Sequence, residues 1–151
     1  MTDTPVIDRA AVARGAAVGL VLFVPLSALR VAIDRGVDDF DHSGWAPAFA
    51  IALFVVYAAA GFVAARMADE APFSNGMLAA IGAFVGWVPI RILIWAVRDS
   101  DQGLFTGRNP ALTVGGIFGQ LVFAAFFGVI GGYVASRRAR AVAPSEPDPS
   151  A

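Results

Sequence analysis

The phrases "GFVAARMADE" (residues 61–70) and "GGYVASRRAR" (residues 131–140) each close a long apolar run. In both, a glycine, an aromatic residue and small apolar residues lead into an arginine. An arginine that directly follows a long apolar stretch is typical of the place where a helix leaves a hydrocarbon layer. The two phrases therefore indicate two helices that end at the same kind of boundary.

The composition supports this interpretation, because 58% of the 151 residues are hydrophobic and only 15% are charged. That balance is too apolar for an ordinary soluble domain of this length and is typical of a chain immersed in lipid. The chain has no cysteine, which excludes disulfides and thiol nucleophiles. A formal net charge of -1 without a long basic run argues against nucleic acid as a partner.

Charged residues divide the chain into four apolar stretches, which predict helices over residues 11–33, 45–66, 73–97 and 110–136. About 20 apolar residues are needed to cross a bilayer as a helix, and a spanning segment must satisfy its own backbone polar groups. We therefore predict an all-α fold, an integral membrane four-helix bundle over residues 11–138. Residues 1–10 form a short N-terminal segment, and residues 139–151 are expected to be a disordered tail rich in Pro and Ser. A cleaved signal peptide is the competing interpretation of the first stretch, but no A-x-A-like site follows it.

A weak internal repeat favours a duplicated transmembrane hairpin. A shift of about seventy residues lays residues 61–66 on residues 132–137, and a shift of about sixty lays Gly15 on Gly76 and Arg30 on Arg91. Because each hairpin would contain two spans, both copies would face the same way.

The arginines also predict an orientation. One side of the membrane would carry Arg9, Arg14, Arg66, Arg137, Arg138 and Arg140, and the other Arg30, Arg35, Arg91, Arg98 and Arg108. Apolar sequence continues beyond Arg30 and Arg91, and discounting these two tips the positive-inside rule toward cytoplasmic termini. The expected location is the inner (plasma) membrane, crossed several times.

The endings "GGYVASRR" and the segment "SNGMLAAIGAF", with Asn75 near its start, resemble a group of small four-helix integral membrane proteins of bacteria, common in actinobacteria. The resemblance covers the whole membrane region. It implies the same four-helix architecture and carries no established activity, cofactor or catalytic residue.

Glycines spaced four apart place small residues on one face of a helix, where lipid-immersed helices can approach closely. Four such pairs are present: Gly15 and Gly19, Gly82 and Gly86, Gly115 and Gly119, and Gly128 and Gly132. They predict packing within the bundle. A homo-oligomer interface needs the same surfaces and stays open as the alternative.

Arg30 and Arg91 are the best candidates for a polar site, because an arginine within an apolar run is usually paired, interfacial or functional. Asp34 lies one helical turn beyond Arg30 and is a candidate partner. Anchoring at the membrane surface is one interpretation, and contact with an anionic lipid headgroup or an anionic solute is the other. No Asp or Glu falls inside a span, which weighs against a proton-coupled carrier.

The remaining polar features favour structural roles. Gln120 and Thr113 are predicted to form interhelical hydrogen bonds. Trp45, Trp87, Trp95 and Tyr133 are predicted to form an interfacial aromatic belt. The loop "DDFDHSGW" matches the opening of a calcium-binding loop at Asp39 and Asp41, but Ala50 stands where the bidentate glutamate should be, so we expect no metal.

The sequence thus predicts a membrane protein without catalytic activity or cofactor, serving as a structural or partner-binding subunit. Its expected partners are the lipid bilayer and either further copies of itself or other membrane proteins. The alternative is a small oligomeric transporter or channel for an anionic or small solute, with a path lined by Arg30 and Arg91.

Overall fold

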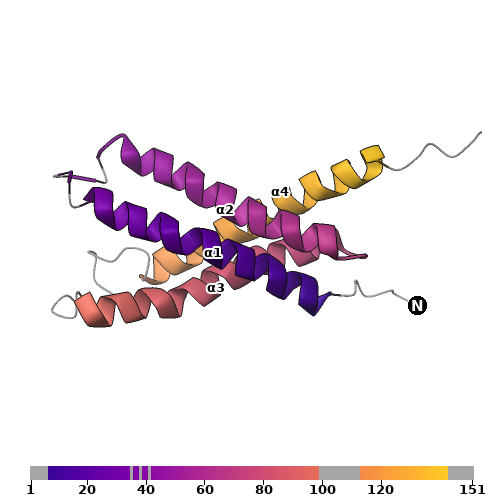
Figure 1. The fold of residues 1–151 in the computed structure, drawn as a ribbon, viewed down its shortest axis with the longest axis horizontal. Coiled ribbons are helices and arrows are strands. Elements are labelled where there is room, and N and C mark those ends of the chain that lie inside the picture. Colours follow the sequence, from indigo (N-terminus) through magenta and orange to yellow (C-terminus); the bar gives the residue numbers. More distant parts are fainter. Residues whose placement is uncertain (1–6, 35, 38, 41, 99–112, 143–151) are drawn as a thin grey trace, which may run out of the picture.

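Four helices account for most of the chain in the computed structural model, which describes residues 7–34, 36–37, 39–40, 42–98 and 113–142 (Figure 1). The helices are α1 (Arg9–Asp34), α2 (Trp45–Met67), α3 (Pro72–Arg98) and α4 (Val114–Val142). All four are long and apolar enough to cross a membrane. The prediction of an all-α chain with four such helices is confirmed.

The helix α4 differs most from its predicted bounds. Its backbone stays helical to Val142, so residues 139–142 extend the helix rather than belonging to the tail expected there. Ala and Arg dominate this extension, and both are good helix formers that need no apolar surroundings. At the other end, the Gly116 N–H donates to Thr113 Oγ1 at 3.1 Å, a cap that explains why the helix begins at Val114. The expected start at residue 110 and the tail beyond residue 142 lie outside the described residues.

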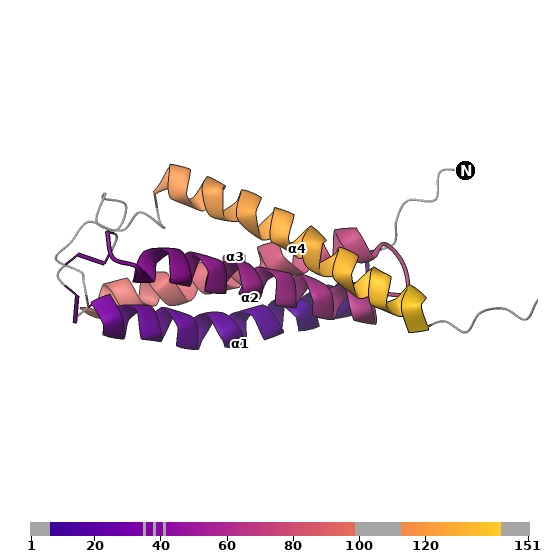
Figure 2. The same cartoon turned by 90° about the horizontal axis from the view of Figure 1, so that it is seen from above.

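Consecutive helices run antiparallel to one another, so α1 begins and α4 ends at the same end of the bundle (Figure 1). We call this the proximal end, and the end where α1 meets the loop to α2 the distal end. The second view shows that α2 and α3 lie between α1 and α4, and that α4 diverges from the other helices toward its first residues (Figure 2). The bundle is therefore tighter at its proximal end.

Helices α2 and α4 cross at the two phrases that end them. A Cβ atom added at Gly131 would overlap the carbonyl oxygen of Ala58 and the backbone nitrogen of Phe62. One added at Gly61 would overlap the backbone of Gly128, which in turn lies against α3 at Gly76. Only a residue without a side chain allows backbones to approach so closely, so these glycines set the position of the crossing.

Helix α1 packs against α2 and α3 through a second set of small residues. A Cβ added at Gly15 would lie 2.6 Å from the Ala60 carbonyl oxygen, and one added at Gly19 would lie 2.6 Å from the Ala83 Cβ. From the facing helix, Gly82 meets Ala16 and Gly86 meets Leu20. The four glycines at 15, 19, 82 and 86 therefore lie at contacts inside the bundle, as do Gly128 at the middle of α4 and Gly132 nearer its proximal end.

Gly115 and Gly119 differ from the other three pairs. No described atom lies within 4 Å of a Cβ added at either position. The physical reason is the divergence of α4, which carries these glycines away from α2 and α3 (Figure 2). The expectation of packing within the bundle does not hold for this pair in the described part of the chain.

Aromatic side chains fill the centre of the bundle. Phe23 of α1 lies 5.4 Å from the Tyr57 ring of α2 and 5.5 Å from the Trp87 ring of α3, and Phe84 stacks on Trp87. Trp87 is buried and donates its indole N–H to Ser27 Oγ at 3.0 Å. It is a core residue, and its assignment to an interfacial belt was wrong because an indole with a partner on a neighbouring helix can be buried.

A duplicated hairpin predicts that α1 and α3 play equivalent roles, as do α2 and α4. The α1–α2 and α3–α4 contacts agree with this equivalence. The close α2–α3 contact does not, because α1 and α4 lie on opposite sides of that pair (Figure 2). The duplication stays a prediction from the sequence.

We expect Gly131→Ala to lower the free energy of unfolding by about 1–3 kcal/mol, because its methyl group overlaps backbone atoms that cannot move independently. Gly44→Ala is the control, because a Cβ added there meets no described atom within 4 Å and its φ of −62° suits any residue, so stability should change by less than about 0.5 kcal/mol. Thermal unfolding in detergent, followed by circular dichroism, measures both. Equal destabilisation by both variants would contradict the assigned crossing.

Candidate functional site

At the distal end, Arg30 contacts the loop that follows α1. Its guanidinium carbon lies 5.0 Å from the centroid of the Phe40 ring. Phe40 is only 6% exposed and packs edge-on against Phe49 of α2, with the centroids 5.6 Å apart. Phe40 is thus one described partner of the Arg30 side chain. The arginine covers a folded loop, as an interfacial cation–π contact does.

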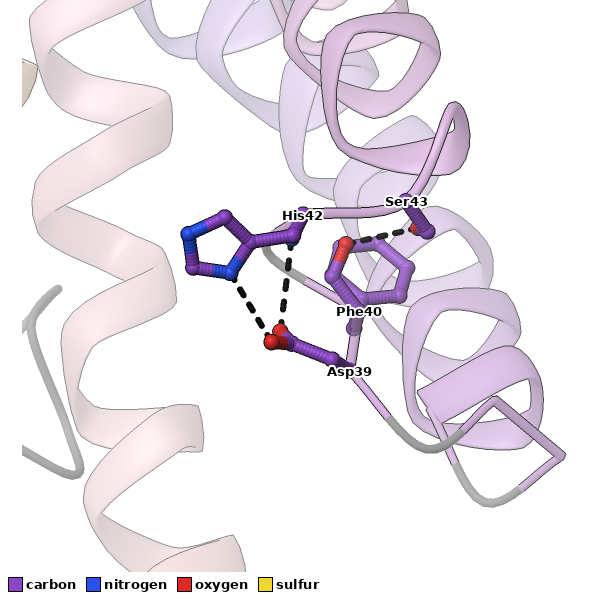
Figure 3. A network of polar contacts seen from close by, with 4 residues as sticks. All are labelled: Asp39, Phe40, His42 and Ser43. Atoms are coloured by element: carbon purple, nitrogen blue, oxygen red, sulfur yellow. Dashed lines mark hydrogen bonds and ion pairs between the residues drawn. The ribbon is translucent and has the colours of Figure 1, made fainter.

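The loop itself is held by short-range hydrogen bonds (Figure 3). Asp39 accepts from the His42 backbone N–H at 3.3 Å, and its other carboxylate oxygen lies 2.9 Å from His42 Nδ1. The Ser43 hydroxyl donates to the Phe40 carbonyl oxygen at 2.6 Å. Asp39 therefore serves as a turn-forming residue, while Asp41, its predicted companion in the calcium-loop comparison, lies outside the described residues.

Arg91 lies two residues beyond Pro89 in the distal half of α3 and is partly exposed. Arg30 is exposed on α1. The side chains that fill the interior are instead Tyr57, Phe84 and Asn75, which are the largest that are fully buried. Neither arginine belongs to the packed centre of the bundle.

Two polar pairs do lie in the interior. The Tyr57 hydroxyl donates to Gln120 Oε1 at 2.9 Å and links α2 to α4, which confirms the predicted interhelical role of Gln120. The Trp87–Ser27 bond links α3 to α1 in the same way. Among the described residues, no buried side-chain nitrogen or oxygen lacks a hydrogen-bond partner. These groups hold helices together, and their hydrogen-bonding capacity is used within the bundle.

Asn75, at the proximal end, forms three side-chain hydrogen bonds. Its amide nitrogen donates to the carbonyl oxygens of Glu70 and Ala71 at 2.9 and 3.2 Å. Its amide oxygen accepts from the backbone N–H of Asp8 at 2.9 Å. One fully buried side chain thereby joins the start of α1 to the connection between α2 and α3.

The segments that Asn75 joins are themselves tightly constrained. The Asp8 carboxylate accepts from the N–H groups of Ala10 and Ala11 at 2.9 and 3.0 Å and caps α1. Ala71 has a φ of 48°, in the left-handed region that non-glycine residues rarely adopt. Asn75 binds the carbonyl of that same residue, so its amide helps to hold an unfavourable backbone conformation.

A groove of about 970 Å³ lies beside this junction, between the end of α2 and the end of α4. Arg66 of α2 and Arg138 of α4 both line it, with Asp69, Phe73 and Ser136. The guanidinium carbons of the two arginines each lie 5.7 Å from the centroid of the same ring, that of Phe62. The neighbouring Arg137 lies over Tyr133 instead, at 5.6 Å. The two phrases that close α2 and α4 thus bring two cations to one groove.

The sequence identified Arg30 and Arg91 as site candidates and did not single out Asn75, Arg66 or Arg138 for such a role. The signal for Asn75 was present, because an amide near the start of an apolar helix must satisfy its polar groups locally. The signal for the groove was the repeated arginine ending. What was missing was the α2–α4 crossing, which decides that the two endings meet.

Compared with protein-family models, curated proteins and solved structures, the chain shows no match. The resemblance to small bacterial four-helix proteins therefore stays a prediction.

We expect Asn75→Ala to lower the free energy of unfolding by about 1–3 kcal/mol, because the substitution removes the side-chain partner of the Asp8 N–H and of the Glu70 carbonyl oxygen. The Ala71 carbonyl oxygen keeps its bond from the backbone N–H of residue 75 at 3.1 Å. The matched control is Ser74→Ala, the adjacent and less buried residue, which should change little. Thermal unfolding midpoints in detergent provide the measurement. An unchanged midpoint for Asn75→Ala would show that the junction holds without its amide.

Proposed function

We propose that the chain is an integral membrane protein that crosses the bilayer four times and acts as a non-catalytic structural or partner-binding subunit. Support for insertion comes from the length and apolar composition of all four helices. Arg66, Arg137 and Arg138 at the proximal end favour a cytoplasmic location for that end, in the plasma membrane.

The observation that carries the subunit role is the unpacked face of α4. Gly115 and Gly119 have no described atom within 4 Å of an added Cβ, and the same face continues through Phe118, Val122 and Phe126. These three side chains are 68%, 50% and 60% exposed. Counted from Gly115, the five residues lie at i, i+3, i+4, i+7 and i+11, which puts them on one stripe of the helix. We call it the α4 stripe.

A second copy of the chain is the partner that this stripe fits. On this surface the glycines leave shallow depressions and the aromatic side chains protrude. Phe118 of one copy can therefore lie over the glycines of the other. Such a self-complementary patch is what a two-fold symmetric contact requires. Close approach of backbones at small residues supplies the packing energy for helix association in lipid.

The absence of catalysis is part of the proposal and is supported by how the interior polar groups are used. Each of five interior polar side chains forms a hydrogen bond to a neighbouring helix or to the backbone, namely Ser27, Tyr57, Asn75, Trp87 and Gln120. A transporter lined by Arg30 and Arg91 is less well supported, because Arg30 is exposed and contacts a loop phenylalanine at the distal end.

The α4 stripe can be tested with single cysteines, because the chain contains none of its own. We expect Phe118→Cys to form a covalent dimer in native membranes on mild oxidation. Gly119→Leu, introduced into the same variant, should reduce the dimer roughly tenfold, since packing of this kind contributes about 1–2 kcal/mol. Dimer yield on non-reducing gels is the measurement.

The matched controls are Ile51→Cys on α2 and Leu93→Cys on α3, which are 63% and 65% exposed and lie in the distal halves of their helices. Both should give little dimer. Similar yields from all three cysteines would indicate random collision, and the α4 stripe would then face lipid alone.

Solute flux separates the subunit from the transporter. We expect liposomes that contain the purified protein to show no chloride or phosphate flux above protein-free liposomes, because the interior is packed with side chains. Flux that Arg30→Gln and Arg91→Gln both abolish, in protein that remains folded, would overturn the subunit role in favour of the transporter.

A further inference from the structure

The groove at the proximal end has a chemistry that helix packing does not explain. Arg66 and Arg138 come from different helices, and both are exposed. Each guanidinium carbon lies 5.7 Å from the Phe62 centroid, so the two are separated by no more than twice that distance. Two cations that share one ring and one groove repel each other weakly in solvent, and an anion bound between them would remove that repulsion.

The charges of both arginines remain available. Within the described part of the chain, neither Arg66 nor Arg138 forms an ion pair, and their described contacts are with the Phe62 ring. A cation–π contact orients a guanidinium group through its face and leaves its N–H groups at the edge free to donate. The planar edge of Arg suits the oxygens of a phosphate, to which it can donate two parallel hydrogen bonds.

The net charge of the lining selects among anions. Arg66 and Arg138 contribute +2 and Asp69 contributes −1, so the charged side chains of the groove sum to +1. A phosphodiester, which carries one negative charge, balances this sum, whereas a dianion would leave excess charge beside Asp69. The Ser136 hydroxyl already donates to the Gly132 carbonyl oxygen at 2.8 Å, so the arginines are the donors available for a phosphate among these polar side chains.

The groove also has an apolar wall. Ala65, Pro72, Phe73 and Ala135 line it alongside the charged residues, and Phe73 is 43% exposed. The arginines lie where α2 and α4 reach the ends of their apolar runs, the level at which a bilayer presents its headgroups. A ligand that is anionic at one end and apolar at the other matches both parts of the lining. The volume of the groove, about 970 Å³, is large enough for a phospholipid headgroup with its glycerol.

We infer that this groove binds the headgroup of an anionic phospholipid, with Arg66 and Arg138 holding its phosphodiester and Phe73 facing its glycerol and acyl carbons. The inference rests on membrane insertion, which is part of the proposed function, but not on the α4 stripe. Basic grooves between helix ends at the cytoplasmic face are suited to this recognition. A lipid held there would bridge α2 and α4 on the outside of their glycine crossing.

The alternative explanation is that these arginines only complement the negative ends of two helix dipoles and set the topology. That role needs positive charge near a helix end, and an arginine on any face of the helix would serve it equally well. Arg137 therefore provides a matched control, because it is adjacent to Arg138 on the same helix and carries the same charge but lies over Tyr133, away from Phe62.

The test is a binding titration of the full chain, purified from the membrane fraction in a neutral detergent. Short-chain phosphatidylglycerol, short-chain phosphatidylcholine and inorganic phosphate serve as separate probes, with binding followed by native mass spectrometry and thermal shift. Recovery from the membrane fraction establishes insertion independently, so a binding failure is distinguishable from a failure of the proposed function.

We expect phosphatidylglycerol to bind more tightly than phosphatidylcholine, and inorganic phosphate to produce no shift. Arg66→Gln and Arg138→Gln should each weaken phosphatidylglycerol binding roughly tenfold, as expected for loss of a charge-assisted pair. Arg137→Gln should change it less than about twofold. Asp69→Asn should strengthen it, because the substitution removes the one opposing charge of the lining.

Three outcomes would overturn the inference. Equal weakening of phosphatidylglycerol binding by all three arginine variants would show that only the overall positive charge of the proximal end matters. Equal binding of the two lipids would show that the anion is not recognised. Binding of inorganic phosphate with the same dependence on Arg66 and Arg138 would identify a soluble phosphate as the ligand. If a glutamine variant fails to fold, the Asp69→Asn variant still tests the sign of the effect in an intact groove.

Discussion

Close contact between the backbones of α2 and α4 is the constraint on which the rest of the bundle depends. At Gly61, Gly128 and Gly131 a single methyl group would overlap backbone atoms of the facing helix. Because Gly128 also lies against Gly76 of α3, three helices share this point of closest approach. In lipid the hydrophobic effect gives little preference for one helix over its surroundings, so packing of this kind decides which helices meet.

Polar groups then make the arrangement specific at the proximal end and in the centre of the bundle. Asn75 joins α1 to the α2–α3 connection at the proximal end. In the interior, the Tyr57–Gln120 bond links α2 to α4, and the Trp87–Ser27 bond links α3 to α1. Each bond satisfies polar groups that would be costly to bury alone. An alternative pairing of the helices would leave these polar groups without hydrogen-bond partners. Small residues allow close packing, and these polar pairs select one packing among several.

Tight packing at the proximal end and divergence of α4 at the distal end give the two ends different properties. The proximal end joins Arg66 and Arg138 beside one phenylalanine, with a groove next to them. The distal end carries an open glycine pair and the aromatic stripe of α4. Because α4 is inclined to its neighbours and contacts them closely at Gly128 and Gly131, it separates from them toward its first residues.

The sequence by itself determined the all-α class, the existence of four long apolar helices and their approximate limits, because hydrocarbon-length apolar runs bounded by charge admit few other structures. It also predicted the interhelical bond of Gln120. Only the tertiary structure decided that Trp87 is buried, that Gly115 and Gly119 are left open, and that Arg66 and Arg138 meet at Phe62. The reason is that lipid-facing and helix-facing surfaces are equally apolar, so periodicity cannot tell them apart, and the neighbours of a residue follow from which glycines interlock.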